Sequence, residues 1–155
     1  MRAGEDGLLE RCAYESIRMA QRSITLRQVL RPVEIDDGIR TYRVSPGVMI
    51  TTMLSVTNTT AADGLDHFDP AHYQGRRLAP SVVLRTKEEV STFGHGIHTC
   101  PAQRFSISAI VIGVGRLLER FDFEPRFSEV RPRRRQIGGV ARADRPCLVR
   151  YRTRS

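Results

Sequence analysis

The sequence has no tryptophan, and aromatic residues make up only 6% of its 155 positions. Hydrophobic residues still account for 40% and charged residues for 27%, which fits one ordinary domain or a piece of a larger one. No apolar run approaches the ~20 residues that a membrane-spanning helix needs. The opening residues also lack the apolar stretch of a signal peptide. We therefore expect one domain over residues 1–155, soluble and cytoplasmic.

Cysteine is scarce as well. The three cysteines, Cys12, Cys100 and Cys147, contain no C-x-x-C pair and cannot all be paired with one another. This argues against a disulfide framework and against a zinc cluster built on these cysteines. It favours a reducing compartment.

The spacing of apolar residues predicts two helices. Over residues 6–20, apolar or small side chains recur at i, i+3 and i+4. A second apolar stripe runs from Ile107 to Phe121. Pro101 suits the first turn of this second helix, where its missing N–H costs nothing.

Shorter segments lie between and after these helices, and together they predict an α+β fold. The segments are strands at 24–36 and 39–44 with a turn at Asp37-Gly38, a second turn at 45–47, a short helix near 53–61, a mostly irregular stretch at 57–92 and strand-like alternation at 146–152. An irregular stretch as long as 57–92 indicates either a function or a missing partner surface.

The segment from Phe93 to Ala102 carries the most information about function. Its glycines, Gly94 and Gly96, allow tight turns and close approach of the backbone to a flat ligand. Cys100 comes directly before a helix, where the positive end of the helix dipole and nearby N–H groups stabilise a thiolate, the form that binds metal. Spacing alone leaves open that Cys100 is an inert, half-buried thiol beside a glycine turn.

Phe93, Gly96, Cys100 and the small residue Ala102 match F-x-x-G-x-x-x-C-x-[G/A], the cysteine-loop motif of the cytochrome P-450 family, which the chain resembles. The resemblance implies that Cys100 is the thiolate ligand of a haem iron. It also implies that Phe93 packs near the thiolate and that Gly96 leaves room for the porphyrin. His98 would donate a ring N–H to a haem propionate. Many members of the family have arginine at this position, and the histidine is similar to that of a sterol-demethylase-like branch. The alternative for His98 is an exposed loop histidine.

Two further motifs follow the order that this family has. Glu15-Ser16-Ile17-Arg18 is an E-x-x-R, which spacing alone describes as a surface ion pair at i and i+3. Residues 68–73, FDPAHY, resemble the family's F-x-P-x-R-F segment, with His72 in place of the arginine. The resemblance implies a cluster of Glu15, Arg18 and His72 beneath the haem. A histidine would weaken the cluster, because it is shorter than arginine and is not always charged. His95 has no assigned role, and we expect it to face solvent.

The resemblance covers residues 8 to about 152. It implies the C-terminal part of the mainly helical P-450 fold: a helix, a β-hairpin, a long meander loop, the cysteine loop, a long helix and short C-terminal strands. The activity implied is that of a haem-thiolate monooxygenase, which takes electrons from a ferredoxin- or flavoprotein-type donor and inserts one oxygen atom into an apolar substrate. The sterol-demethylase-like branch would imply a sterol-like substrate. Segments that would cover the other haem face are absent from these residues. We therefore expect impaired activity in this truncated chain alone, with a complementary N-terminal P-450 portion as a candidate partner.

Two other interpretations compete with this one. The formal net charge is +8, and an arginine-rich segment at residues 129–155 contains a dense cluster made of Arg131, Arg133, Arg134 and Arg135. A non-catalytic fragment or binding module could use this segment for a partner protein or nucleic acid. Nucleic acid is less favoured, because no aromatic side chains interleave to stack bases. A redox role for Cys100 without haem ranks last, since no resolving cysteine lies nearby in sequence.

Overall fold

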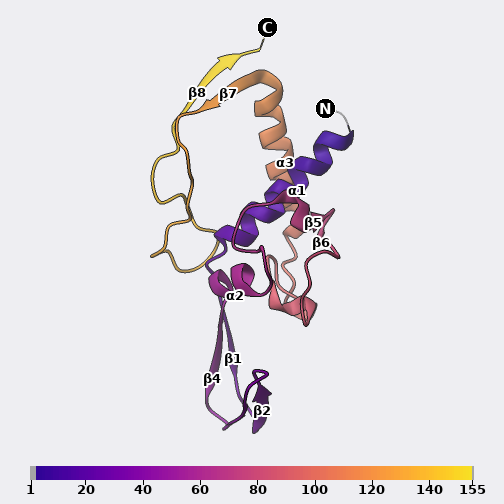
Figure 1. The fold of residues 1–155 in the computed structure, drawn as a ribbon, viewed down its shortest axis with the longest axis vertical. Helices are drawn as coiled ribbons and strands as arrows, with labels where there is room; N and C mark the ends of the chain where they lie inside the picture. The colour runs from indigo at the N-terminus through magenta and orange to yellow at the C-terminus, as the bar shows by residue number, and fades with distance from the viewer. Residues whose placement is uncertain (1–2, 155) are drawn as a thin grey trace.

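The computed structural model describes residues 3–154, with side chains from residue 7 onward. Two long helices, α1 (Ala3–Ala20) and α3 (Gln103–Arg120), cross and pack against each other at the centre of the molecule (Figure 1). Both lie where the apolar spacing predicts them. The expected place of Pro101 is wrong, however, because α3 begins two residues later. The backbone first closes a turn in which the N–H of Gln103 donates to the carbonyl of Cys100 at 3.3 Å.

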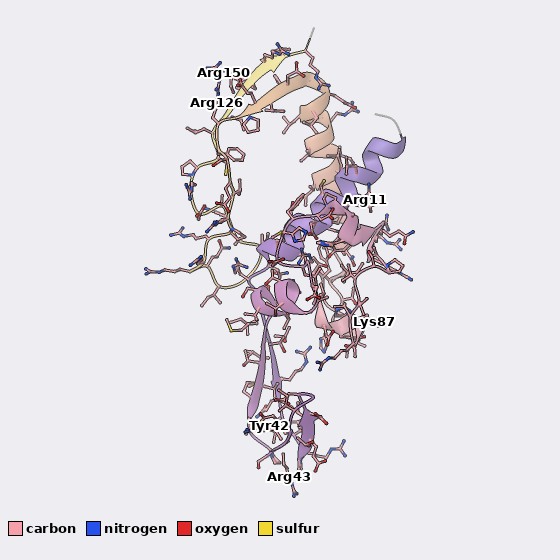
Figure 2. All side chains as sticks on the ribbon, in the orientation of Figure 1. Arg11, Tyr42, Arg43, Lys87, Arg126 and Arg150 are labelled. Atoms are coloured by element: carbon pink, nitrogen blue, oxygen red, sulfur yellow. The ribbon has the colours of Figure 1, made fainter. Side chains whose placement is uncertain are left out.

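A β arm extends from the helices. Strand β1 (Ile24–Gln28) pairs antiparallel with β4 (Met49–Met53), and β2 (Val33–Asp36) pairs antiparallel with β3 (Thr41–Val44). Figure 1 shows these strands reaching well beyond the helical body, and Figure 2 places Tyr42 and Arg43 at the far end of the arm. The predicted hairpin turn at Asp37-Gly38 is confirmed: the Asp37 carboxylate accepts two backbone N–H groups, and Gly38 has a φ of 87°.

Short elements follow the arm. Helix α2 (Leu54–Thr60) confirms the short helix expected near 53–61. The irregular stretch after it contains η1 (Pro70–His72), β5 (Tyr73–Gln74) paired with β6 (Arg77–Leu78), and η2 (Lys87–Glu89). The first part of this stretch lies against α1, because η1 and β5 both contact that helix. The segment from Phe93 to Ala102 that follows contains η3 (Gly96–His98).

The chain ends in a two-stranded ribbon. Strand β7 (Phe121–Pro125) follows α3 directly and pairs antiparallel with β8 (Val149–Thr153), beside which Figure 2 marks Arg126 and Arg150. The segment between the two strands returns to the end of α1, where the N–H of Ala141 donates to the carbonyl of Ala20 at 2.7 Å. The strand expected at 146–152 is thus present, whereas β7 has no counterpart among the predictions.

The buried core is small. It groups Tyr14 and its neighbours on α1 with Tyr73 and Ile107. The Tyr14 and Tyr73 rings stack with centroids 5.2 Å apart, and burial raises the pKa of Tyr73 to about 12. Only one face of α3 contributes to this core, so large apolar side chains elsewhere on the helix, such as Phe105, stay exposed. Within residues 3–154, no helix has both the length and the apolar character to cross a membrane.

Candidate functional site

Glu15 and Arg18 lie one turn apart on α1, and both side chains are 0% exposed. The guanidinium of Arg18 donates two hydrogen bonds to the carboxylate of Glu15, from Nε to Oε2 at 2.8 Å and from Nη2 to Oε1 at 2.6 Å. The prediction from spacing alone, an ion pair on the surface, is therefore wrong. The pair is buried because residues 58–69 fold over this face of α1.

The remaining N–H groups of Arg18 hold that covering loop. Its Nη1 donates to the carbonyl oxygens of Asn58 and of Leu65, the latter at 2.6 Å, and its Nη2 donates to the carbonyl of His67 at 3.2 Å. All five N–H groups of the guanidinium thus have acceptors. A buried charge needs such complete pairing, since burial without partners is very costly.

Glu15 also joins the covering loop to α1. Its Oε1 accepts the backbone N–H of Asp69 at 3.0 Å and lies 2.9 Å from Nδ1 of His72. The structure thus brings together the predicted cluster, with histidine at its third position. Burial by itself would raise the pKa of Glu15. The hydrogen bonds, led by the one from Arg18, outweigh it and hold the pKa of Glu15 below its usual value.

Asn58 connects this cluster to the cysteine loop, a role that the sequence did not reveal. The side chain is fully buried. Its Nδ2 donates to the carbonyls of Arg18 and Ser91 at 3.2 and 3.0 Å, and its Oδ1 accepts the N–H of Ser91 at 2.8 Å. The Ser91 hydroxyl in turn accepts the N–H of Gly94 at 3.1 Å. Nothing in the local pattern around Asn58, a run of threonines, signals this role.

The cysteine loop is closed by its own backbone. The N–H of Cys100 donates to the carbonyl of Phe93 at 2.7 Å, and the 3-10 helix η3 fills the space between them. The Phe93 ring packs edge-on against Tyr14, with ring centroids 5.9 Å apart. Phe93 therefore anchors the loop to the core while its carbonyl fixes the backbone of Cys100. Ala102 is the N-cap residue of α3.

The two histidines of the loop differ from each other. His95 is half-buried, and its Nε2 lies 2.9 Å from the carbonyl oxygen of Val90. The expectation that His95 faces solvent is therefore wrong, because this hydrogen bond turns the ring inward. His98 is exposed, which leaves its ring free to meet a ligand.

A hollow of ≈ 860 Å³ lies between the cysteine loop, the base of the β arm and α3. Its size falls in the range of about 300–1,000 Å³ that is usual for sites of small molecules and cofactors. The lining residues that matter here are Ile24, Thr25 and Leu26 of β1, Ile110 of α3, and Phe93, Gly94, His98 and Cys100 of the loop. Cys100 is half-buried and unpaired, as are the other two cysteines. The hollow thus combines a free thiol with apolar walls.

Comparison with known proteins decides the family. A family model described as "Cytochrome P450" matches residues 7–150, nearly the whole chain. The chain belongs to the cytochrome P450 family. The mixed helices and strands of the structure agree with an α+β member of that family, and P450 membership implies a haem cofactor.

Two fungal P450 relatives show how similar the sequences are and how much of each chain is covered. A bicoumarin synthase of Aspergillus desertorum is 29% identical over 125 residues, which cover 75% of this chain and 23% of the relative. A cytochrome P450 monooxygenase of Penicillium terrestre is 27% identical over 119 residues, which cover 72% of this chain and 22% of the relative. The chain therefore spans less than a quarter of the length of either relative. Neither name refers to a sterol, so the sterol-demethylase-like branch stays a prediction.

The predicted site residues of this P450 chain fall into two groups, those of the cysteine loop and those of the cluster on α1. Phe93, Gly94, His98 and Cys100 line one hollow, whereas Gly96 and Ala102 shape the loop and the helix start beside it. The predicted trio of Glu15, Arg18 and His72 forms a separate buried cluster on α1, joined to the loop through Asn58 and Ser91. The cluster is thus connected to the loop by hydrogen bonds but does not line the hollow.

Replacing Gly94 with alanine should destabilise the P450 fold by more than the about 1–3 kcal/mol that a strained backbone position alone costs. Gly94 has a φ of 80°, and an added Cβ would overlap the carbonyl oxygen of His98. Gly96 is the matched control, because its φ of 58° is also positive but an added Cβ would meet no atom within 4 Å. Urea unfolding of both variants checks this. Equal losses would show that the overlap at Gly94 is relieved at no cost.

The stabilisation that Glu15 gives should disappear in acid. A carboxylate with a lowered pKa stabilises the fold fully above its unfolded pKa of about 4.3, and the effect is lost as pH falls through the folded value. We expect wild type to be more stable than Glu15→Gln at pH 7 and the difference to shrink below about pH 4. Urea unfolding at several pH values measures this difference. A difference that stays constant down to pH 2 would contradict the assigned pKa direction.

Proposed function

We propose that this chain is the haem-binding, C-terminal part of a P450 monooxygenase, in which Cys100 supplies the thiolate ligand to the haem iron. The observation that carries the proposal is the position of Cys100, a half-buried free thiol in an apolar-walled hollow, on a backbone held by the carbonyl of Phe93. The donor chemistry fits, since a thiolate is a soft ligand well suited to iron centres.

Each loop residue has a defined part in this proposal. Gly94 and Gly96 carry no side chain, so the backbone can lie close to the porphyrin. His98, exposed at the hollow, would donate a ring N–H to a propionate. When bound, haem supplies the iron at which oxygen is activated, and a thiolate ligand favours cleavage of the O–O bond. The side chains of Ile24, Leu26 and other apolar residues of the hollow would exclude water from this side.

The exposed apolar side chains of α3 and of the β arm support a partner for this chain. Phe105, Ile112 and Leu117 on α3 and Leu26 and Met49 on the arm are all exposed. Apolar patches on a protein surface mark interaction sites, and these exposed side chains are candidates for such a patch. We propose that a complementary N-terminal P450 portion covers these side chains and completes the pocket for an apolar, sterol-like substrate.

An electron donor of ferredoxin or flavoprotein type belongs to the same proposal. The net charge of +8 supports an acidic donor, because opposite charge speeds encounter between proteins. The binding-module alternative is less favoured. Within its arginine cluster, Arg131 is already bonded to Glu129 at 2.7 Å, and family membership supplies a role for the rest of the chain without it.

Titration of haem into the purified chain, followed by absorbance, tests the proposal. We expect saturable binding of one haem per chain. A complementary N-terminal portion would supply further contacts to the haem, so we expect weaker binding by this chain alone than by a complete P450. Haem uptake that never saturates would contradict the proposal. Uptake equal to that of an unrelated protein of similar size and net positive charge would contradict it as well.

A further inference from the structure

We propose that His67, Asp69 and His72 form a binding site for a divalent transition-metal cation, most simply Zn²⁺, on the surface of the loop that covers α1. One ligand atom from each residue lies within 4.8 Å of the other two. Ligand bonds of about 2.0–2.2 Å around a tetrahedral Zn²⁺ place donor atoms roughly 3.3–3.6 Å apart. Small side-chain rotations therefore bring the three donors to bonding distance. Two imidazoles and a carboxylate are a donor set that suits zinc, copper and nickel.

His72 is oriented for this task by a residue behind it. Its Nδ1 lies 2.9 Å from Oε1 of the fully buried Glu15, an oxygen that can only accept. The proton of a neutral His72 is therefore on Nδ1, and the lone pair of Nε2 points away from Glu15. A carboxylate that fixes the far nitrogen of a histidine is the usual support of a metal ligand in proteins.

The two histidine rings border the same small space. A Cβ placed on Gly64 would lie 3.5 Å from Cε1 of His67 and 3.8 Å from Nε2 of His72, so the glycine leaves this space open. The ring centroids are 5.5 Å apart with planes at 60°, which suits two ligands that approach one ion from different directions. Asp66 Oδ1 lies 3.3 Å from Nδ1 of His67 and plays for it the part that Glu15 plays for His72.

Asp69 supplies the third donor without leaving its present role. Its Oδ1 accepts the N–H of Ala71 at 2.8 Å at the start of η1, and the second carboxylate oxygen remains for the ion. Three protein ligands leave a fourth position for water, because His67 is 62% exposed. The positive charge of Arg18 nearby is balanced by its two bonds to Glu15.

An ion at this site would change the charge of the cluster formed by Glu15, Arg18 and His72. In this chain His72 stands where the family pattern has arginine, so the cluster lacks one permanent positive charge. An ion on Nε2 of His72 would restore positive charge at that position. It would also tie residues 67–72 to one another, next to the point where Arg18 and Glu15 tie them to α1.

Calorimetric titration of the metal-free, reduced full chain with Zn²⁺ tests the site. We expect one ion per chain, and a rise in melting temperature that chelator reverses. The deciding variant is His67→Ala, because this exposed side chain has little part in the fold. It should weaken Zn²⁺ binding at least tenfold without changing the urea midpoint in chelator. Asp63→Asn, an exposed acidic residue of the same loop outside the trio, is the control and should leave the affinity unchanged.

Co²⁺ in place of Zn²⁺ identifies the ligands. We expect the visible absorption of a tetrahedral ion with nitrogen and oxygen donors. A strong thiolate-to-metal charge-transfer band would place the ion on a cysteine and overturn the proposal. Equal affinity of wild type and His67→Ala would also overturn it, as would absence of Zn²⁺ binding at millimolar concentration. Because haem is not needed for any of these measurements, the outcome is independent of the haem proposal.

Discussion

Replacing Arg18 with alanine should lower the free energy of unfolding by about 3–5 kcal/mol, the usual cost of removing one partner of a buried ion pair. The substitution leaves the carboxylate of Glu15 buried without its main counter-charge. It also leaves the carbonyls of Leu65 and His67 without their donor. A loss of this size is a large share of the stability of a small domain, so the variant should be largely unfolded at moderate urea concentrations.

A second ion pair between arginine and glutamate in the same chain serves as the control, with the two residues in the reverse order. Arg116 and Glu119 on α3 are also three residues apart, with Nη1 2.9 Å from Oε2, but Arg116 is 73% exposed. Arg116→Ala should therefore cost no more than about 1 kcal/mol. Urea unfolding at pH 7, followed by circular dichroism, compares the two variants. Similar losses for Arg18→Ala and Arg116→Ala would contradict a special role for the buried pair.

Replacing Cys100 with alanine should abolish specific haem binding, with a loss of affinity of more than about 100-fold, since a direct ligand matters at least as much as its supporting residues. The fold should change little, because the loop is closed by the backbone bond from Cys100 to Phe93, which alanine keeps. Haem titrations followed by absorbance measure the affinity.

The other two cysteines are the controls for this prediction. Cys12 lies on α1, and Cys147 lies near β8 with its thiol 3.7 Å from the carbonyl of Arg145. Cys12→Ala and Cys147→Ala should bind haem as wild type does. If Cys100→Ala also retains wild-type affinity, the thiolate assignment is wrong. The competing interpretation of Cys100 as an inert thiol would then stand.

The helices and the hairpin turn follow from local patterns. The apolar stripes on α1 and α3 repeat at helical spacing over several turns, and Asp37-Gly38 offers both a side-chain acceptor and a residue that tolerates positive φ. Strand β7 escaped prediction because it continues directly from α3. Phe121 is itself the last position of the helical apolar stripe, and the pairing of β7 depends on β8, which lies 24 residues further along the chain.

The site was predictable only in part. Local spacing places Glu15 and Arg18 on one helix face but says nothing of burial, which depends on a loop without periodicity. Only the resemblance in three motifs pointed to a cluster with His72. The bonds of Asn58 to residues 40 and 33 positions away have no local signal at all. Long-range hydrogen bonds between irregular segments are set by the tertiary fold.

The reduced, carbon-monoxide difference spectrum of the haem-loaded chain tests the central claim most directly. The account predicts the strongly red-shifted absorption band typical of thiolate-ligated haem, and predicts its absence in Cys100→Ala. The histidines nearest to the hollow, His95 and His98, are the competing ligands within the cysteine loop. An ordinary, unshifted band in the wild-type chain, or failure to hold haem at all, would contradict the assignment of Cys100 as the haem ligand.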